Sequence, residues 1–294
     1  MGLKVLVTGA NGFIGRQVVL ELVSRSDVEV LGLQRSLSDK AFLKEVDYFN
    51  SDHMRRIFQE FKPDAVVHLA SDTSRSRESK LLPRFLEANV SLSLCLLEAA
   101  AACSLNPKFV VFSTSEVYGP QEGILNESAN LRPVSPYGVS KKMMEQLFEY
   151  YARLYGMHCD VFRLFNAYGI GQSEGYFLAD LSKAFAVKQV FNMTKGEQQR
   201  DFVYIKDVVN AVVFSIRRTD GFNVYNLSTG NLVSLNEVVE KFETLIAPRP
   251  LQVRKELPYR SNEIWRMGGD PSKLKQAGFQ CAFDLEAGLK EMLV

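Results

Sequence analysis

The chain of 294 residues is 46% hydrophobic and 23% charged, which is enough apolar material for a large buried core. Lys and Arg number 35 and Asp and Glu 34, so the formal net charge of +1 argues against a nucleic-acid groove or an acidic membrane face. The four cysteines include no Cys-x-x-Cys pair, and the three histidines form no ligand-spaced cluster with them. No charged and then apolar leader precedes the first expected strand, and no apolar run is expected to reach membrane-spanning length. We therefore expect a reduced, cytoplasmic protein without a metal site that acts on a small molecule.

Strands and helices are expected to alternate through the first half of the chain. In chain order the pattern predicts a strand at 4–7, a helix at 13–24, strands at 28–33 and 65–69 around a helix at 52–61, a long apolar-periodic helix at 81–102, a strand at 109–113, a helix at 136–155 and a strand at 159–164. Continuously apolar strands are typical of a parallel sheet with both faces covered by helices. We predict an α/β fold with a doubly wound parallel sheet of the Rossmann type.

The regular alternation of expected strands and helices ends after Asn166, where mixed elements and several glycine turn signals follow. No repeat, low-complexity tract or charge block marks a linker. We predict a dinucleotide-binding domain from residues 1–165 together with about 202–228. Residues 166–201 and 229–294 would form a smaller mixed α/β region for the second substrate.

The segment TGANGFIG, Thr8–Gly15, follows the first expected strand and spaces three glycines three residues apart. A glycine-rich turn between a strand and the helix it feeds exposes backbone N–H groups and a helix N-terminus to a pyrophosphate. The candidate dinucleotide ligands are therefore Gly9, Asn11, Gly12, Phe13, Ile14 and Gly15. The alternative interpretation is an ordinary tight turn, because such glycine patterns also recur by chance.

The segment YGVSK places Tyr137 and Lys141 four residues apart at the start of an expected helix. A phenol has a pKa of roughly 10, and an ammonium group one helical turn away favours the phenolate. Tyr137 is then a usable acid or base, while Lys141 can also donate to the nicotinamide ribose and the Thr114 hydroxyl can hold the substrate oxygen. Taken singly, Tyr137 and Lys141 could equally be solvated helix residues.

These motifs resemble the extended branch of the short-chain dehydrogenase/reductase superfamily, the NAD-dependent epimerase/dehydratase family. The resemblance rests on the Thr-Gly-x-x-Gly-x-x-Gly loop, YGVSK, FSTSEVYG, RLFNAYGIGQ, QQRDFVYIKD and RSNEIW, and it spans nearly the whole chain. The segments LRPVSPYGVSK and FNAYGIGQ, with the short length, are most similar to reductases of nucleotide-linked 4-keto-6-deoxyhexoses, the GDP-linked type derived from mannose being the nearest. The resemblance implies a Rossmann domain, a nucleotide-sugar-binding region, and a homodimer formed by the helices expected at 81–102 and 136–155.

The resemblance also implies contacts that spacing alone does not give. Leu69 and Ala70 would line the dinucleotide, and Ser71, Thr73 and Ser115 would border the reacting sugar ring. Asn166, Arg200 and Arg260 would clamp the diphosphate, with Glu263 near the sugar or base. Asn166 could instead cap a turn, Arg200 could pair with Asp201 or Asp207, and His68 is expected to be a core histidine.

The end of the second expected strand reads GLQRS, and it bears on the choice of cofactor. An NAD site usually offers a carboxylate there to the ribose 2′-OH, whereas this chain has Gln34, Arg35 and Ser36. A guanidinium can bind a 2′-phosphate, so NADP(H) is favoured over NAD, although Arg35 could also point into solvent. The family often has Asp at the position of Phe49, so adenine recognition would rely on Asp52 or on backbone groups.

The sequence leaves four functions open. The leading prediction is NADPH-dependent reduction of the C4 keto group of a nucleotide-linked 4-keto-6-deoxyhexose, with Tyr137 as proton donor. The alternative is a nucleotide-hexose 4-epimerase with a tightly bound dinucleotide, against which the missing strand-end acid argues. Glu116 occupies the position of an extra base in related dehydratases, so a 4,6-dehydratase is a third possibility, beside a non-catalytic NADP-binding regulator.

Overall fold

The computed structural model describes residues 2–35, 42–48, 50–74, 76–248, 251–260 and 262–293. The chain forms two compact units: unit 1 contains residues 1–119, 130–163 and 209–225, and unit 2 contains residues 120–129, 164–208 and 226–294. Four segments that were predicted in the dinucleotide-binding domain therefore lie in unit 2, namely residues 120–129, 164–165, 202–208 and 226–228. For residues 120–129 and 202–208 the reason is strand pairing, because both segments supply strands that pair with others of unit 2.

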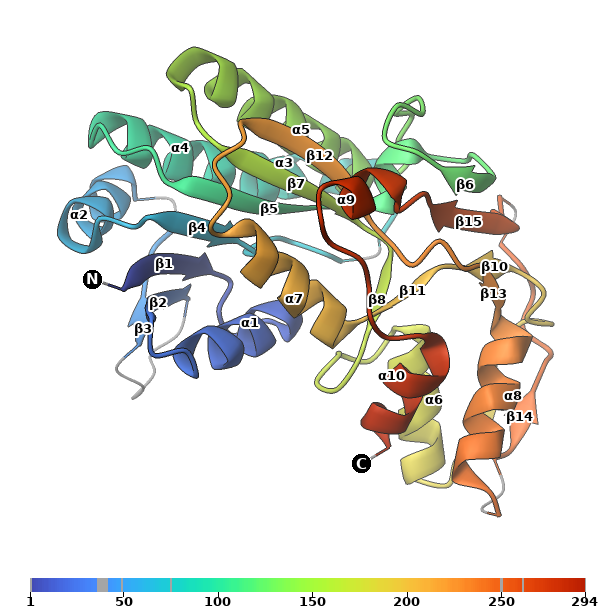
Figure 1. Ribbon diagram of the computed structural model, residues 1–294. Coiled ribbons are helices and arrows are strands. Elements are labelled where there is room, and N and C mark those ends of the chain that lie inside the picture. Colours follow the sequence, from blue (N-terminus) through green and yellow to red (C-terminus); the bar gives the residue numbers. More distant parts are fainter. Residues whose placement is uncertain are drawn as a thin grey trace. The chain divides into compact units, whose positions relative to one another are not determined.

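Unit 1 is built on a seven-stranded sheet with the order β12-β7-β5-β4-β1-β2-β3 (Figure 1). Its strands are β1 (Leu3–Thr8), β2 (Val28–Gln34), β3 (Leu43–Glu45), β4 (Ala65–His68), β5 (Lys108–Thr114), β7 (Cys159–Leu164) and β12 (Phe222–Leu227). β1 pairs in parallel with β2 and β4, and β4 pairs in parallel with β5. The strand order thus reverses direction at β1, where the carboxyl ends of β1 and β4 create the switch point of a doubly wound sheet. The predicted fold class is confirmed, and β3 is an addition that the sequence did not indicate.

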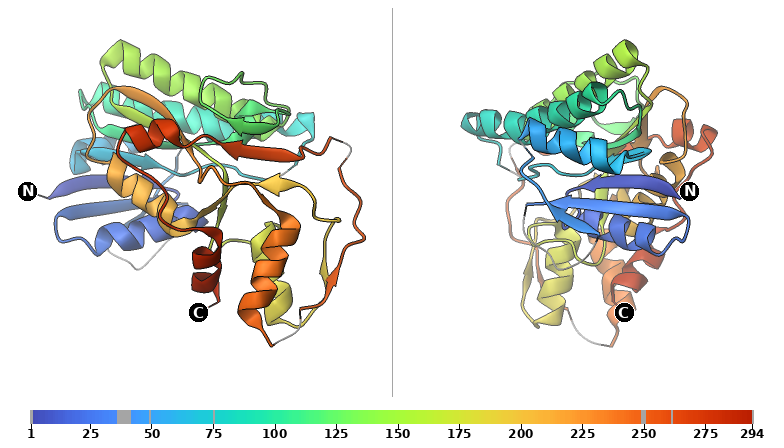
Figure 2. Two further views of the ribbon diagram at one scale, coloured as in Figure 1. Left: turned by 45° about the vertical axis from the view of Figure 1, so that its right-hand side comes forward. Right: turned by 90° about the vertical axis from the view of Figure 1, so that its left-hand side faces the viewer.

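Helices cover both faces of this sheet. They are α1 (Phe13–Val23), α2 (Ser51–Phe61), α3 (Leu82–Leu86), α4 (Leu92–Ala102), α5 (Pro136–Tyr155) and α7 (Ile205–Ser215), with 3₁₀ turns at Ser79–Leu81 and Ser115–Tyr118. Figures 1 and 2 show α2, α4 and α5 on one face, with α1 and the unit 1 part of α7 on the other. The bounds of α5 are those predicted, because Ser135 caps its N-terminus and Gly156 ends it in the left-handed conformation.

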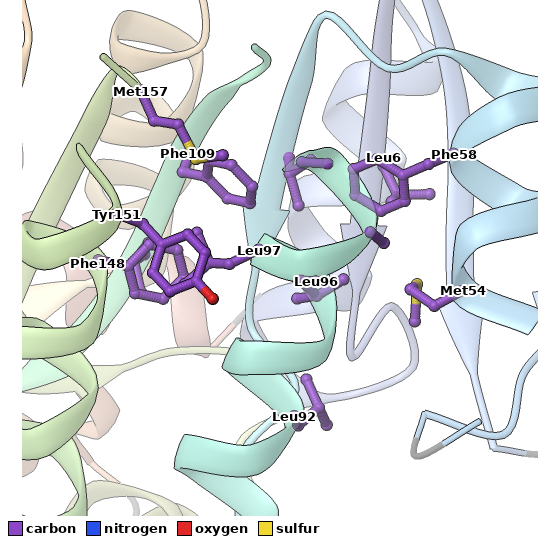
Figure 3. Close-up of a cluster of buried hydrophobic side chains, with 14 of the residues drawn as sticks. Leu6, Met54, Phe58, Leu92, Leu96, Leu97, Phe109, Phe148, Tyr151 and Met157 are labelled. Atoms are coloured by element: carbon purple, nitrogen blue, oxygen red, sulfur yellow. The ribbon is translucent and has the colours of Figure 1, made fainter. Parts of the chain in front are cut away.

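The core on the α4 face joins three helices to the sheet (Figure 3). Leu92, Leu96 and Leu97 of α4 lie between Phe148 of α5 and Phe58 of α2. These side chains are at most 5% exposed, and each buried aliphatic or aromatic side chain contributes roughly 1.5–3 kcal/mol. This packing holds α5, which carries Tyr137 and Lys141, firmly against the sheet.

The predicted helix at 81–102 has an irregular middle and begins earlier than expected. A 3₁₀ turn, α3, a π-helical turn at Glu87–Ser91 and α4 form one helical segment, Ser79–Ala102. Its 24 residues are long and apolar enough for a membrane span, which corrects the expectation that no apolar run reaches that length. Half of its most apolar window is buried inside the protein, as in the core helix of a soluble fold, so the segment is weak evidence for a membrane.

Unit 2 is a mixed α/β region of short strands. A four-stranded sheet has the order β13-β10-β15-β6, and two-stranded sheets pair β11 with β8 and β14 with β9. The strands are β6 (Gly123–Leu125), β8 (Asn166–Tyr168), β9 (Phe191–Asn192), β10 (Gln199–Arg200), β11 (Phe202–Tyr204), β13 (Val233–Ser234), β14 (Val253–Arg254) and β15 (Arg266–Gly269); the helices are α6 (Phe177–Ala186), α8 (Leu235–Ile246), α9 (Ser272–Gln276) and α10 (Leu285–Met292).

A buried carboxylate organises the loops of unit 2. Asp201 is fully buried and accepts hydrogen bonds from the backbone N–H groups of Thr229, Gly230 and Gly269 and from the Thr229 hydroxyl. Arg200 is therefore not the partner of Asp201. Asp207 is likewise occupied, since it accepts from the backbone N–H groups of Ala282 and Phe283.

Candidate functional site

The glycine-rich loop is shaped by close backbone contacts that only glycine permits. Gly9 has a φ of +67°, and a Cβ added there would lie 2.7 Å from the backbone nitrogen of Ala70. A Cβ on Gly15 would lie 2.0 Å from the carbonyl oxygen of Gly9. The middle glycine, Gly12, is the N-cap of α1, and its N–H donates to Gly9 O at 3.0 Å. The loop therefore needs its first and third glycines for its own packing.

The N-terminus of α1 is open to an anion. Gly12 provides no side-chain cap, and the first turn of α1 contains no acidic residue. The first backbone N–H groups of a helix have no partner within the helix, and the helix dipole favours a negative charge there. With Asn11 and Gly12 exposed and Phe13 and Ile14 half-buried, these residues fit a pyrophosphate group of a dinucleotide.

A tyrosine that the sequence did not single out fixes the loop. Tyr48 is 4% exposed, and its hydroxyl accepts from Gly9 N at 3.0 Å and donates to Leu33 O at 2.6 Å. Ala10 N donates to the same Leu33 oxygen at 3.2 Å. Tyr48 thus joins the loop to the end of β2. In the sequence Tyr48 is an aromatic residue before the helix expected at 52–61, and nothing there indicates a hydroxyl contact.

The end of β2 presents Arg35 but hides Gln34. Gln34 is 4% exposed, whereas Arg35 is exposed and borders a hollow of about 470 Å³ together with Asp47 and His53. The acidic side chains along this hollow are Asp47 and Glu45, and the expected Asp52 is not among its lining residues. Ser36 and Phe49 lie outside the described residues. At the end of β2 itself the hollow is bordered by the Arg35 guanidinium and by no carboxylate of that strand, and a guanidinium fits the 2′-phosphate expectation.

The catalytic candidates Tyr137 and Lys141 are both on the first turns of α5. The Nζ of Lys141 lies 5.9 Å from the centroid of the half-buried Tyr137 ring. Lys141 is 3% exposed, and its ammonium donates to Phe112 O at 2.8 Å at the end of β5. The structure therefore brings this pair together and fixes the lysine by a backbone carbonyl.

Burial makes Lys141 an unusual lysine. Removal from water lowers its pKa from 10.5 to about 7, and the Glu145 carboxylate one turn further along α5 partly opposes this effect. A lysine with such a pKa exchanges its proton near neutral pH. Perturbed groups of this kind are common at functional sites.

Thr114 and Glu116 are fixed by hydrogen bonds, one between the two residues and one from the N-cap of α5 to Glu116. Thr114 is 9% exposed, and its side-chain oxygen accepts from Glu116 N at 3.2 Å. Ser135, the N-cap of α5, donates its hydroxyl to Glu116 at 2.5 Å. Glu116 therefore positions the end of the helix that carries Tyr137, and Ser115 beside it is half-buried.

A buried ion pair behind these residues was not anticipated. Arg163 of β7 donates from Nη2 to Glu145 at 2.8 Å and from Nη1 to the Tyr118 hydroxyl at 3.2 Å, and both charged side chains are 6% exposed. The Ser113 hydroxyl also donates to Glu145. Glu145 therefore anchors α5 to β5 directly next to Thr114. The spacing from Lys141 to Glu145 was visible in the sequence, but its partner on β7 was not.

The loop after β4 lies against the glycine-rich loop. Leu69 N and Ala70 N donate to the Thr8 hydroxyl oxygen at 3.2 and 3.1 Å. Ser71 donates its hydroxyl to the buried Asn89 at 2.8 Å, whereas Thr73 is exposed. Leu69 and Ala70 are thus well placed beside the expected dinucleotide loop within unit 1.

Unit 2 contains the other candidates. Arg200 donates to Glu263 at 2.5 Å and to Ile264 O at 2.7 Å, so its ion-pair partner is Glu263 and neither of the aspartates considered from the sequence. Burial lowers the pKa of Arg200, Glu263 raises it, and Arg260 lowers it, which places both arginines and Glu263 in one cluster. Asn166 donates its amide to Asp201 O at 2.9 Å. Among the described residues of the chain, no three acidic, His or Cys side chains form a metal-binding group.

Comparison with known proteins identifies the family. Residues 5–228 match the model of the NAD dependent epimerase/dehydratase family. The chain belongs to this family. It is 28% identical to a UDP-glucuronate 4-epimerase of Thermodesulfobacterium geofontis, over 97% of this chain and 93% of that protein. It is 29% identical to a GDP-6-deoxy-D-talose 4-dehydrogenase of Aggregatibacter actinomycetemcomitans, over 92% of this chain and 90% of that protein.

A solved structure of a 4-epimerase resembles the whole chain. The UDP-glucose 4-epimerase of Thermus thermophilus, in complex with NAD, has a TM-score of 0.87 and 27% sequence identity, covering 99% of this chain and 98% of that one. The family and fold expected from the motifs are therefore confirmed, while the reductase subtype is not.

Proposed function

We propose that the chain oxidises or reduces C4 of a hexose carried on a nucleoside diphosphate, with a nicotinamide dinucleotide that supplies or accepts the hydride when bound. The observation that carries this proposal is the pair of Tyr137 and the buried Lys141 on α5, in the same unit as an uncapped α1 and a tightly packed glycine loop. The relatives named above include a 4-epimerase and a 4-dehydrogenase of nucleotide sugars, and both names refer to C4.

The chain's own residues would manage the proton at the C4 oxygen. The Tyr137 phenol would donate the proton when the alcohol forms and would remove it in the opposite direction. Lys141 would favour the phenolate electrostatically, since a cation lowers the free energy of a nearby anion in a buried site. The Thr114 hydroxyl would hold the C4 oxygen through a hydrogen bond.

The 4-epimerase is the version that the comparisons favour. Two of the three proteins described above are 4-epimerases, and the solved one is a complex with NAD. In an epimerase the same C4 is oxidised and then reduced on its opposite face, so no net cofactor is consumed. On this evidence 4-epimerisation is the better supported form of the proposed reaction.

A specific feature keeps NADPH-dependent 4-keto reduction as the second candidate. The end of β2 offers no carboxylate for the ribose 2′-OH, because Gln34 is buried there and Arg35 faces the hollow. A guanidinium at this place favours NADP(H), which commonly serves net reduction. For a 4,6-dehydratase the feature is Glu116, which is exposed two residues after Thr114, whereas a non-catalytic NADP-binding regulator has no such feature in its favour.

The residues of unit 2 would hold the nucleotide diphosphate. Arg260 is exposed, whereas Arg200 is already paired with Glu263. We therefore propose that Arg260 supplies the net positive charge that balances the diphosphate. Arg200 and Asn166 would act as directional hydrogen-bond donors to it.

A homodimer through α4 and α5 accompanies this proposal. The exposed apolar side chains of α5 include Met143 (42%), Tyr150 (58%) and Leu154 (54%), and α4 adds Leu94 (39%). A second copy could bury this surface in a four-helix interface. Light scattering that gives the mass of a monomer at micromolar concentration would refute the dimer.

One experiment separates the candidates. The purified protein is incubated with NAD⁺, NADH or NADPH and a panel of UDP-, GDP-, CDP- and dTDP-linked hexoses and 4-keto-6-deoxyhexoses. Interconversion of two saturated nucleotide sugars without loss of nicotinamide absorbance supports the epimerase. Consumption of one NADPH for each keto sugar, with deuterium transferred to C4 from deuterated cofactor, supports the reductase. Neither product from any member of the panel would refute both.

A further inference from the structure

His68 is a buried histidine whose two ring nitrogens are both engaged. It is the last residue of β4, 2% exposed, and lies between the glycine-rich loop and the long helical segment Ser79–Ala102. Its Nδ1 is 2.8 Å from the Thr8 hydroxyl, and its Nε2 is 2.9 Å from the Ser93 hydroxyl. It therefore touches the first residue of the dinucleotide loop on one side and α4 on the other.

The hydrogen bonds around His68 determine which nitrogen carries the proton. The Ser93 hydroxyl donates to Asn89 O at 2.6 Å, so its oxygen can only accept from the histidine, and Nε2 must bear hydrogen. Nδ1 is then an acceptor and receives the Thr8 hydroxyl proton. The Thr8 oxygen keeps its two lone pairs for the N–H groups of Leu69 and Ala70. This arrangement satisfies each donor and acceptor in the chain of contacts.

The same chain of contacts continues to the catalytic helix. Asn89, fully buried in the π-helical turn, donates its amide to Ser140 Oγ at 2.9 Å, and Ser140 donates to Tyr137 O at 2.8 Å. The Asn89 side-chain oxygen accepts from Asp72 N at 2.8 Å, in the loop after β4. The glycine-rich loop and the residues around Tyr137 are thus joined through buried side chains within unit 1.

We propose that His68 is a positioning residue, a neutral imidazole with its proton on Nε2. It ties the dinucleotide loop at Thr8 to the helical segment Ser79–Ala102, which in turn contacts α5. Its role for a dinucleotide rests on the function proposed above. If the imidazole lost its contact with Thr8, the threonine hydroxyl would turn away from Leu69 and Ala70, and the loop would lose its fixed place at the end of β4. His68 does not touch the reacting atoms.

Electrostatics keep this histidine neutral. Burial and, to a smaller extent, the charge of the Lys141 ammonium together lower the pKa of His68 to about 3. The charged group that acts on it is Lys141, and the carboxylate that acts on Lys141 in turn, Glu145, is already paired with Arg163. The neutral tautomer therefore persists throughout the pH range in which the protein would work.

The tautomer can be observed directly by nitrogen NMR. The chain has three histidines, so selective ¹⁵N labelling with a His68→Asn variant assigns the signal of His68. We expect a protonated Nε2 and an unprotonated Nδ1 that do not shift between pH 5 and pH 8. A proton on Nδ1, or a titration in that range, would overturn the proposal.

Two substitutions separate the two contacts of the ring. In His68→Gln the longer amide reaches the place of Nε2 and keeps the contact with Ser93, whereas in His68→Asn the shorter amide reaches the place of Nδ1 and keeps the contact with Thr8. We expect His68→Gln to raise hydrogen exchange in residues 8–15 of the ligand-free protein, and His68→Asn to leave that segment protected. His158→Gln is the matched control, because His158 also makes a ring-nitrogen hydrogen bond, to Gly221 N at 3.1 Å.

Cofactor binding gives the readout that a purely structural role would not move. We expect His68→Gln to weaken NADPH or NADH binding by about fivefold to tenfold, as for one lost buried hydrogen bond, and His68→Asn to bind within twofold of the wild type. Equal losses in the two variants, in binding and in exchange, would mean that His68 only fills space. If the wild type binds no dinucleotide, the proposed function fails, while the tautomer and the exchange of residues 8–15 still decide whether His68 orders the loop.

Discussion

Replacing Lys141 with methionine is expected to change the way the stability of the protein depends on pH. Methionine has a similar length and no charge, so it removes the buried ammonium while keeping most of the packing. In the wild type the folded protein holds this lysine at a pKa of about 7, whereas the unfolded chain has the ordinary value of 10.5. Between these two values the unfolded chain binds a proton that the folded one does not, so stability rises with pH.

The size of the effect follows from the two pKa values. One pKa unit corresponds to about 1.4 kcal/mol, so the full burial cost of the ammonium at acidic pH is roughly 5 kcal/mol. Between pH 7 and pH 9.5 the wild type should gain roughly 3 kcal/mol that Lys141→Met does not gain. The variant also leaves Phe112 O without its donor, at a cost of about 1–3 kcal/mol, but this cost does not depend on pH and cancels from the comparison.

The assay is urea unfolding of wild type and variant at pH 7.0, 8.5 and 9.5 without ligands, followed by circular dichroism. Lys142→Met is the matched control, since Lys142 is the next residue of α5, is partly exposed and donates to Leu131 O at 3.0 Å. The control should follow the pH dependence of the wild type. The activity of Lys141→Met should fall by about 100-fold or more, because Tyr137 loses its neighbouring cation.

Parallel pH curves for wild type and Lys141→Met would refute this reasoning. They would mean that the folded protein keeps Lys141 protonated up to its ordinary pKa. The burial of Lys141 against Phe112 O would then not make it a group that exchanges its proton near neutral pH, whereas its part as a cation beside Tyr137 in the proposed reaction would stand.

Three further predictions follow from the same unit. Arg35→Asp should weaken NADPH binding far more than NADH binding in fluorescence titrations, because a carboxylate repels a 2′-phosphate; equal losses would mean that Arg35 is not at the ribose. Tyr137→Phe should lower turnover by roughly 100-fold or more while dinucleotide affinity persists, and unchanged turnover would remove Tyr137 from the chemistry. Glu145→Gln should lower the free energy of unfolding by roughly 3 kcal/mol, because Arg163 would be left buried without its carboxylate; a loss below about 1 kcal/mol in urea unfolding would contradict this.

Local patterns in the sequence were enough to predict the fold of unit 1. The strand at β7 and the helix at α5 were predicted with their observed bounds, because a buried apolar run, a Ser-Pro start and a glycine stop are local signals. The glycine loop and the Tyr137–Lys141 spacing likewise depend only on neighbours in the chain. The short strand β3 was missed because three residues carry too little periodicity.

Unit 2 was much less predictable. Its strands are two to four residues long, and they pair across large sequence separations, as β15 does with β6. The segment 120–129 belongs to unit 2 only because of that pairing, and no composition change marks it. The partner of Arg200 was misjudged for the same reason, since Glu263 is far away in sequence whereas Asp201 is adjacent.

The sequence by itself determined the family, the alternating fold and the spacing of the candidate pair Tyr137 and Lys141, since each depends on residues within a few positions of one another. The tertiary structure alone decided the pKa of Lys141, the contact of Tyr48 with Gly9, the pairing of Glu145 with Arg163 and the tautomer of His68. Burial and hydrogen-bond partners across the sheet set these properties, and residues distant in the chain supply both. A residue type can reveal that a group is ionisable, but only its packed surroundings establish in which form it exists.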